Sequence, residues 1–316
     1  MASPTRSPRP RALVFGGTGM VGTAVADCWR RRGAAVLALS REQADVTDRA
    51  AVLGWARRFG AEVVINCAAF TRVDDCETQE DLATAVNGTA VGHLAEAAEV
   101  CGAALLHVST DYVFDGSART PIPEDAPTAP RSAYGRSKLV GEQHALAFER
   151  ATVLRTSWVF GPGGPNFAAT IRRLLAEGRT PLRVVDDQVG RPTSSGSIAR
   201  ALWDLACLHV ATGGHGAATH AVPRIVHYGD REPVSWHGFA TEIARRLAPH
   251  AEVVPVTTDE FPRPAERPAY SVLDVSRFEA LAGRPVEPWI SGLSTYLDSL
   301  VPFAPAPRPA LLENRS

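Results

Sequence analysis

The sequence predicts an α/β fold, in which a doubly wound parallel sheet carries a smaller C-terminal lobe. Short apolar runs alternate with segments of helical spacing up to about residue 157. Strands that are apolar on both faces, each followed by a helix, are typical of a parallel sheet covered on both sides. After Thr156 the pattern changes, because a glycine- and proline-rich stretch at 161–165 opens a loop. The second half of the chain is therefore expected to form most of a separate lobe.

The elements of the sheet can be placed from the limits of the apolar runs, which are bounded by glycine, asparagine, serine or threonine. The expected strands are residues 12–15, 35–39, 63–65, 104–108 and 153–154. The expected helices are residues 20–32, 48–59, 79–101 and 134–149, where apolar residues recur at helical spacing.

The composition is that of an ordinary globular chain and excludes several classes of function. The 33 basic residues balance 34 acidic ones without a long basic run, so no nucleic-acid partner is expected. The apolar run near the start is too short for a signal peptide or a membrane span. Five cysteines without metal-ligand or redox spacing indicate a reducing, cytoplasmic compartment. His209 and His220 lack the partners that a metal site needs, so no metal is expected.

A glycine-rich turn at 16–22 follows the first expected strand. Gly16, Gly19 and Gly22 let the backbone turn tightly and approach a pyrophosphate, and a helix starting near Met20 directs its free amides at that anion. A plain turn is the alternative. The strand before it, the amphipathic helix after it and a second strand about twenty residues on favour nucleotide binding. We therefore expect a Rossmann-type, NAD(P)-binding domain.

The expected domain limits follow from these elements. They are residues 11–157 for the NAD(P)-binding domain, with 181–232 partly returning to it, and 158–180 and 233–301 for the substrate-binding lobe. The proline-rich ends, residues 1–10 and 302–316, are expected to be disordered tails, and residues 213–216 an exposed loop.

The end of the second expected strand indicates which nicotinamide cofactor binds. An acidic residue there favours the free 2′-hydroxyl of NADH, and a basic residue favours the 2′-phosphate of NADPH. Arg41 and Glu42 stand side by side, and Ser40 with Arg41 favours NADPH, with NADH as the alternative.

A tyrosine and a lysine four residues apart follow the fourth expected strand. If the segment is helical, Tyr134 and Lys138 share a face, and Lys138 can stabilise the phenolate of a side chain whose pKa is ordinarily ~10. Ser109 and Thr110 end the fourth strand, where the carboxyl ends of parallel strands face a ligand. An exposed surface pair is the alternative for Tyr134 and Lys138, and His107 is interpreted as a core residue.

These features together resemble the extended short-chain dehydrogenase/reductases, which combine a glycine turn, a hydroxyl after the fourth strand and a Tyr-x-x-x-Lys motif. Further segments resemble the dTDP-4-dehydrorhamnose reductase family within that group, over roughly residues 11–297. These segments are residues 66–71, 109–114, 155–161, 166–167, 187–193 and 267–268, with Ser271, Leu273 and Asp274.

The resemblance implies hydride transfer from NADPH to the C4 ketone of a dTDP-linked 6-deoxy-4-keto sugar, most specifically dTDP-4-dehydro-L-rhamnose. Tyr134 would be the general acid, Thr110 would hydrogen-bond the carbonyl, and Lys138 would lower the pKa of Tyr134 and hold the nicotinamide ribose. A homodimer is also expected, because dimers are frequent in the family.

The resemblance also implies two sets of binding residues. The expected cofactor residues are Gly16, Thr18, Gly19, Met20, Val21, Gly22, Ser40, Arg41, Asp45, Val46, Cys67, Ala68, Ala69, Asn87, Tyr134 and Lys138. The expected substrate residues are Thr71, Thr110, Asp111, Tyr112, Trp158, Asn166 and Gln188. Three of these residues have structural alternatives: Trp158 as a core residue, and Asn166 and Asn87 as helix caps.

Two departures keep other functions open. The stretch at 208–224 is longer than the family usually carries, and residues 229–232 replace the small polar run expected before Trp236. Another dTDP-deoxysugar 4-ketoreductase is therefore an alternative. A second is a non-catalytic subunit resembling the regulatory subunit of methionine adenosyltransferase, because a fold does not guarantee turnover.

Overall fold

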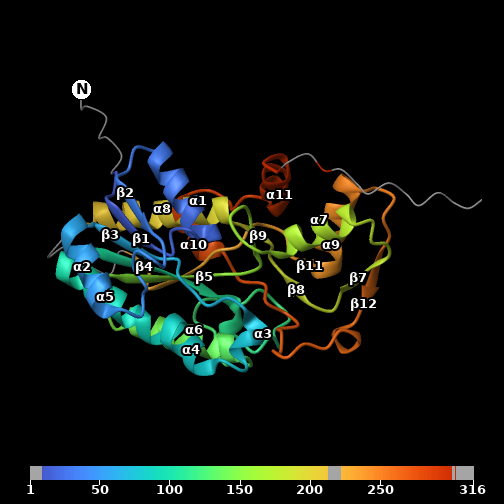
Figure 1. Cartoon of the computed structure of the whole chain (residues 1–316), viewed down its shortest axis with the longest axis horizontal. Coiled ribbons are helices and arrows are strands. Elements are labelled where there is room, and N and C mark those ends of the chain that lie inside the picture. Colours follow the sequence, from blue (N-terminus) through green and yellow to red (C-terminus); the bar gives the residue numbers. More distant parts are fainter. Residues whose placement is uncertain (1–8, 213–221, 301–302, 304–316) are drawn as a thin grey trace, which may run out of the picture.

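A computed structural model of the chain describes residues 9–212, 222–300 and 303. The expected loop at 213–216 lies outside these residues, as do the expected tails apart from residues 9, 10 and 303. Figure 1 shows a sheet covered by helices on both faces, with a smaller group of helices and strands beside it.

The central sheet has six parallel strands in the order β10, β5, β4, β3, β1 and β2. These are β1 (Ala12–Phe15), β2 (Val36–Leu39), β3 (Val63–Asn66), β4 (Ala104–Thr110), β5 (Ala151–Thr156) and β10 (Ile225–His227). The predicted α/β class with a parallel sheet is thus confirmed. Because all six strands run the same way, their carboxyl ends meet at one edge, and Phe15, Asn66 and His107 lie in register there.

Alternating side chains of the strands form two cores, one on each face of the sheet. Leu13 and Phe15 pack in a cluster with α2 (Arg49–Phe59) and α5 (Ala90–Cys101). Ala12 and Val14 point the other way, toward α1 (Met20–Arg31), α8 (Ser195–Ala211) and α10 (Ser276–Ala282). Figure 1 shows these two helical layers on opposite faces of the sheet. Strands buried on both faces explain the continuous apolar runs of the sequence.

The expected helix at 79–101 is interrupted in the structure. It consists of α4 (Glu80–Thr84), a π-helical turn η1 (Ala85–Thr89) and α5. Within the turn, Asn87 is buried and hydrogen-bonds to Phe70 and Ser137, while a Cβ on Gly88 would lie 2.9 Å from Val140. These tertiary contacts hold the backbone in a π-helical turn although the sequence has the spacing of an α-helix. Single π-helical turns inside helices are frequent at functional sites.

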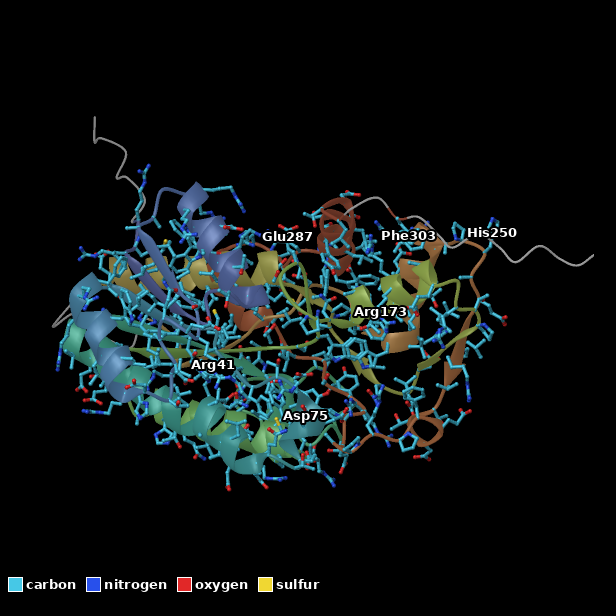
Figure 2. All side chains as sticks on the ribbon, in the orientation of Figure 1. Arg41, Asp75, Arg173, His250, Glu287 and Phe303 are labelled. Carbon is cyan, nitrogen blue, oxygen red and sulfur yellow. The ribbon has the colours of Figure 1, made fainter. Side chains whose placement is uncertain are left out.

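The C-terminal lobe has a core of its own. The lobe contains α7 (Phe167–Ala176), β7 (Leu182–Val185), α9 (Trp236–Leu247), β12 (Val253–Val256), η4 (Thr258–Glu260) and α11 (Trp289–Asp298). Phe160, Ile171, Phe239 and Leu293 are buried in it. Figure 2 places Arg173 and His250 in this lobe, and Arg41 and Asp75 in the first domain. The exact domain limits given above stay a prediction.

Helix α6 (Ala133–Leu146) packs against the sheet beside α5. The remaining elements are short. They are α3 (Val73–Cys76), η2 (Asp111–Val113), and the pairs β6 (Val159–Phe160) with β9 (Thr193–Ser194) and β8 (Val189–Gly190) with β11 (Val234–Ser235). Across the described ranges, none of the helices is long and apolar enough to cross a membrane. Over the same ranges, His, Cys, Asp and Glu side chains form no group of three or more that could hold a metal ion.

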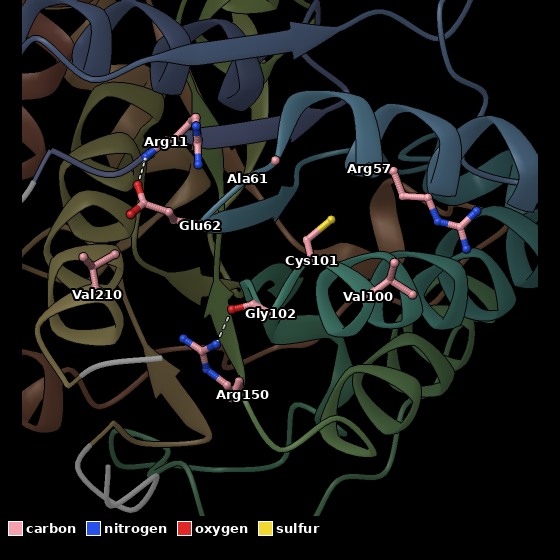
Figure 3. A pocket seen from close by; sticks show the side chains of 10 residues that line it. Arg11, Arg57, Ala61, Glu62, Val100, Cys101, Gly102, Arg150 and Val210 are labelled. Carbon is pink, nitrogen blue, oxygen red and sulfur yellow. Dashed lines mark hydrogen bonds between the residues drawn. The ribbon is translucent and has the colours of Figure 1, made fainter. Parts of the chain in front are cut away.

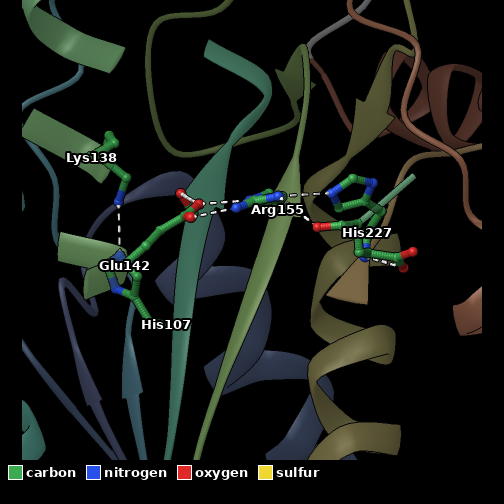
Figure 4. A network of polar contacts seen from close by, with 7 residues as sticks. His107, Lys138, Glu142, Arg155 and His227 are labelled. Atoms are coloured by element: carbon green, nitrogen blue, oxygen red, sulfur yellow. Dashed lines mark hydrogen bonds and ion pairs between the residues drawn. The ribbon is translucent and has the colours of Figure 1, made fainter. Parts of the chain in front are cut away.

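A buried ion pair joins α6 to the sheet. Arg155 on β5 donates two hydrogen bonds to Glu142 on α6, at 2.9 and 2.7 Å, and their side chains are only 3% and 2% exposed. Ser109 donates a third hydrogen bond to Glu142. Arg155 also contacts His227, and Figure 4 shows Arg155 between Glu142 and His227. Paired charges with this geometry are tolerated in a core, whereas a single one is costly.

Glu142→Ala is expected to lower the free energy of unfolding by about 3–5 kcal/mol, because it leaves the Arg155 guanidinium buried without its counter-charge. Glu80→Ala is the matched control, since Glu80 pairs with Arg136 on the surface and such pairs contribute at most about 1 kcal/mol. Urea unfolding of both variants measures the difference. Equal, small losses would contradict a structural role for the buried pair.

Candidate active site

Thr110, Tyr134 and Lys138 are brought together at the carboxyl edge of the sheet. Thr110 is the last residue of β4, and Tyr134 and Lys138 occupy successive turns of α6. Ser132 caps α6 by accepting a hydrogen bond from the Gly135 amide, so the helix begins directly before Tyr134. A Cβ on Gly135 would lie 2.2 Å from the Tyr112 carbonyl oxygen, so glycine permits α6 to approach η2 this closely.

Tyr134 lies among groups that act on its protonation. Its ring meets that of Tyr112 edge to face, with centroids 5.5 Å apart. Burial raises the pKa of Tyr134, a hydrogen bond with Thr110 opposes this rise, and the nearby carboxyl of Asp111 adds to it. The phenol is therefore held as a neutral proton donor.

Lys138 is oriented differently from the sequence expectation. Its ammonium donates a hydrogen bond to the Val108 carbonyl oxygen at 2.7 Å and lies 3.4 Å from Nε2 of His107. Burial and hydrogen bonding, rather than the charge of Lys138, are the main influences on the pKa of Tyr134. The expected lowering of the Tyr134 pKa by Lys138 is thus not seen in this arrangement, because the lysine side chain is directed at β4.

Asp111 adds an unsatisfied acceptor beside the phenol. Its side chain is buried, one carboxyl oxygen accepts a hydrogen bond from Thr110 at 3.0 Å, and its Oδ2 has no hydrogen-bond partner among the described residues. Burial raises the pKa of Asp111 to about 6. A buried acceptor of this kind costs free energy unless a donor satisfies it, so Oδ2 is suited to a hydroxyl of a bound molecule.

A cavity of about 240 Å³ lies along the glycine turn. Nine of the expected cofactor residues line it: Gly16, Thr18, Gly19, Arg41, Asp45, Val46, Cys67, Ala68 and Ala69. Ala44, Phe70, Arg72, Leu82 and Val86 also line it and were not predicted, although Phe70 and Arg72 directly follow a predicted run. Met20, Val21, Gly22 and Ser40 are not part of this lining.

The backbone of the turn explains its glycines. Gly16 has φ +74°, and a Cβ on Gly22 would lie 2.1 Å from the Gly16 carbonyl oxygen. Gly19 caps α1 without a side-chain hydrogen bond, so the first amides of the helix stay available. A helix N-terminus of this kind is an anion site, and in a Rossmann-type fold it holds the pyrophosphate of a dinucleotide.

The cavity adjoins Tyr134 and Lys138. Cys67, which lines it, is close enough to interact electrostatically with Lys138, and Phe70 packs in a cluster with Tyr134. A cofactor in the cavity would therefore extend toward Tyr134.

Two asparagines of the expected site have structural hydrogen bonds. Oδ1 of Asn87 accepts from the Phe70 amide, and its Nδ2 donates to the Phe70 carbonyl oxygen and the Ser137 hydroxyl. Asn166 caps α7 by accepting from the Ala169 amide, and its Nδ2 donates to the Gly161 and Gly164 carbonyls. Asn87 is a tether between η1, α6 and the loop after β3, and its contact with the cofactor stays a prediction. Asn166 matches the capping alternative, because its Oδ1 accepts from the Ala169 amide at the start of α7, and its contact with the substrate stays a prediction.

A second cavity, of about 510 Å³, opens in the C-terminal lobe. Gln188 is part of its lining and donates a hydrogen bond to Thr258 at 3.0 Å. The other lining residues include Phe167, Arg183, Trp236, Arg263 and Arg267. Neither Trp236 nor Arg267 was predicted to bind the substrate. Thr71 is exposed and lines neither this cavity nor the one at the glycine turn.

Trp158 lies against this cavity through Trp236. The two indoles stack with centroids 3.5 Å apart and planes 3° apart. Trp158 has φ 47°, in the left-handed region that non-glycine residues rarely adopt, and a Cβ on Gly190 would lie 2.4 Å from its ring. Such strain persists where the surroundings hold it, often at functional sites. Trp158 is thus held in place by contacts from β8 and α9.

Arg267 connects the second cavity to the catalytic region. Its guanidinium donates to both carboxyl oxygens of Asp74 on α3, at 3.0 and 3.1 Å. It is also close enough to influence the pKa of Tyr112, whose ring packs on Tyr134. Arg267 thus belongs both to the lining of the second cavity and to the surroundings of Tyr112.

A further hollow lies at the other edge of the sheet (Figure 3). Its volume is about 460 Å³, and Arg11, Arg57, Glu62 and Cys101 help to line it. Arg11 and Glu62 precede β1 and β3, so this hollow is at the amino ends of the strands, away from Thr110. It does not belong to the candidate active site.

The chain is similar to proteins of known identity. The model of the RmlD substrate binding domain family matches residues 10–301. The dTDP-4-dehydrorhamnose reductase of Streptomyces griseus is 43% identical over 305 residues, which is 96% of this chain and 98% of that protein. The probable dTDP-4,6-dihydroxy-2-methyloxan-3-one 4-ketoreductase of Streptomyces antibioticus is 41% identical, covering 90% of this chain and 93% of that protein.

A solved structure extends this similarity to three dimensions. The dTDP-4-dehydrorhamnose reductase of Bacillus anthracis, in complex with NADP, matches with a TM-score of 0.82 and 29% identity, over 92% of this chain and 99% of that chain. Since the family model and these relatives span nearly the whole chain, the protein belongs to the dTDP-4-dehydrorhamnose reductase family.

Proposed function

We propose that this protein uses NADPH to reduce the C4 ketone of a dTDP-linked 6-deoxy-4-keto sugar, converting dTDP-4-dehydro-L-rhamnose to dTDP-L-rhamnose. The observation that carries the proposal is the meeting of Thr110, Asp111 and Tyr134 at the carboxyl edge of the sheet, in a protein with one cavity along the glycine turn and another in the lobe. Membership of the reductase family supports the same reaction.

The glycine turn, Arg41 and the residues after β3 would hold NADPH, which supplies the hydride. As negative charge develops on the ketone oxygen, Thr110 donates a hydrogen bond to it and Tyr134 transfers its phenolic proton to it, giving the hydroxyl. Lys138 would turn from β4 to hold the ribose hydroxyls. Oδ2 of Asp111 would accept a hydrogen bond from a sugar hydroxyl and so orient the ring.

The cavity of the lobe suits the nucleotide part of the substrate. Arg183, Arg263 and Arg267 line it beside the apolar faces of Trp236 and Phe167. Arginines recognise phosphate oxygens and aromatic faces bind flat rings, so this lining fits a nucleoside diphosphate. We also propose a cytoplasmic homodimer. The five cysteines lack metal-ligand and redox-pair spacing, which supports a reducing compartment, and sedimentation of the purified protein tests the dimer.

The function is tested by following NADPH consumption with dTDP-4-keto-6-deoxyglucose and the 3,5-epimerase that generates the rhamnose-series ketone. Multiple turnovers that form dTDP-L-rhamnose are expected. Turnover without the epimerase would instead favour the second candidate, another deoxysugar 4-ketoreductase, which the similarity to the Streptomyces antibioticus protein supports. Stable NADPH binding without oxidation of any ketosugar would favour a non-catalytic subunit and overturn the proposal.

Tyr134→Phe is expected to lower kcat by ~10²–10⁴ while leaving NADPH affinity unchanged, because it removes the proton donor and keeps the ring. Tyr296→Phe is the matched control, since its hydroxyl makes only a 3.5 Å contact with Asn166 in the lobe. Steady-state kinetics and a fluorescence titration with NADPH measure the two quantities. Turnover within a few fold of the unchanged protein would show that Tyr134 is not the acid.

Arg41→Ala is expected to weaken NADPH binding roughly tenfold or more and to leave NADH binding almost unchanged, because a charged hydrogen bond to the 2′-phosphate is worth about 1.5–3 kcal/mol. Arg49→Ala is the control, since Arg49 pairs with Glu96 away from the cavity lining. Fluorescence titrations of both cofactors measure the change. If the unchanged protein binds NADH more tightly than NADPH, the predicted preference for NADPH is wrong.

Trp236→Leu is expected to raise the KM for the ketosugar up to about tenfold, because Trp158 loses a stacking partner worth about 0.5–1.5 kcal/mol. Trp236→Phe should retain most of the affinity. Trp203→Leu is the control, because Trp203 packs edge to face on Trp29 at the other side of the protein. If Trp236→Leu, Trp236→Phe and Trp203→Leu all have the KM of the unchanged protein, the stack of Trp236 on Trp158 does not position Trp158 for the substrate.

A further inference from the structure

The half-buried Ala68 amide and the buried side chains of Asn66, His107 and Lys138 form a chain that ends at Lys138. Asn66, the last residue of β3, is paired in the sheet with His107 of β4. Oδ1 of Asn66 accepts from the Ala68 amide at 3.0 Å, and Nδ2 of Asn66 lies 3.0 Å from Nδ1 of His107. Nε2 of His107 lies 3.4 Å from Nζ of Lys138, which also donates to the Val108 carbonyl oxygen at 2.7 Å. Figure 4 shows the contact of Lys138 with His107.

The donors and acceptors of this chain have a fixed direction. A backbone amide can only donate, so the oxygen of Asn66 must face Ala68, and its NH₂ group must face His107. Nδ1 of His107 must then accept, and a neutral ring carries its single hydrogen on Nε2. That hydrogen points at the nitrogen of Lys138. An N–H facing an ammonium is unfavourable, whereas an N–H facing the lone pair of an amine is a hydrogen bond.

We propose that Asn66 and His107 are positioning residues for Lys138, which lock the imidazole in its Nε2–H tautomer and thereby favour the neutral amine of the lysine while it faces β4. The catalytic consequence rests on the function proposed above. A lysine held this way loses its proton more easily than an exposed one, and it binds that proton more strongly after it turns from His107 toward a ligand.

The surroundings of Lys138 fit this tautomer. Burial and the nearby lysine hold the pKa of His107 well below its usual range, so the ring is neutral. Burial lowers the pKa of Lys138 to about 8. Glu142 on the same helix and Cys67 after β3 act in the opposite direction, and the charge of Glu142 is offset by Arg155 on β5. Tyr134 lies one turn before Lys138, and Asp111 acts on Tyr134.

The composition of the chain makes the lysine directly observable. Lys138 is the only lysine among the 316 residues, and every other residue with a basic aliphatic side chain is an arginine. Protein labelled with ¹³C and ¹⁵N in lysine therefore gives one ε-methylene and one ζ-nitrogen signal. The pKa of Lys138 can be measured from these signals without substrate, cofactor or turnover.

The first test uses the unchanged protein. Nitrogen NMR of labelled histidine, with the His107 ring identified by its proximity to the labelled lysine, is expected to show the hydrogen on Nε2. The lysine signals are expected to titrate well below the ordinary value of ~10.4. A hydrogen on Nδ1 in the unchanged protein would overturn the proposal.

Asn66→Asp then reverses the tautomer without changing the shape of the side chain. A carboxylate accepts from both Ala68 and His107, so Nδ1 takes the hydrogen and Nε2 offers a lone pair to the ammonium. The pKa of Lys138 is expected to rise by about one unit or more, because the charged form gains an acceptor and a nearby opposite charge.

The rise has two causes, the new acceptor at Nε2 of His107 and the new negative charge at position 66. Asn66→Asp in a His107→Leu background separates them, since it keeps the charge and removes the imidazole ring. A clearly smaller rise in this background supports the tautomer lock, and an equal rise overturns it. Should either variant fail to fold, the tautomer of the unchanged protein still decides the question. The NMR results are independent of turnover, so a correct tautomer with no ketosugar reduction would leave the lock intact and reject the proposed function.

Discussion

Helix α6 is held against the sheet by the Glu142 carboxylate, which accepts hydrogen bonds from Arg155 on β5 and Ser109 on β4. Tyr134, Lys138 and Glu142 are spaced four residues apart, so they lie on the same face of the helix, one turn after another. The ion pair sets where Glu142 meets the sheet, and the helix period then sets the positions of Lys138 and Tyr134. The position of Tyr134, the proposed proton donor, therefore depends on a charge pair two turns away.

Small residues let this helix approach its neighbours. A Cβ on Gly135 would meet the Tyr112 carbonyl oxygen, and one on Gly141 would lie 2.1 Å from the Asn87 carbonyl oxygen. The buried amide of Asn87 in turn hydrogen-bonds to Ser137 of α6 and to the loop after β3. That loop lines the cavity along the glycine turn. The same contacts that fix α6 thus shape the wall of the proposed cofactor site.

The sequence predicted the parts of the molecule whose signals are local. Apolar runs located the strands of the sheet, and the glycine spacing located the cavity at the end of β1. It failed where a tertiary contact decides. The π-turn at Asn87 depends on a partner that is distant in the chain, namely Ser137 of α6. The capping of α7 by Asn166 is a local contact with the Ala169 amide, and the sequence offered it as an alternative. No binding role was predicted for Arg267 and Trp236, since their partners Asp74 and Trp158 are distant in sequence.

The use of one lysine in an arginine-rich chain has a physical reason at this position. An arginine keeps its charge at any pH a protein meets, and its planar group needs several acceptors at once. The space beside β4 offers the Val108 carbonyl oxygen as an acceptor, and in the proposed tautomer His107 directs its Nε2 hydrogen into the same space. A guanidinium buried there would carry a permanent charge against that hydrogen, whereas an amine can give up its proton or turn on a flexible stem. The surroundings therefore select a residue that can change its charge, which is also what a group that alternates between the sheet and a cofactor requires.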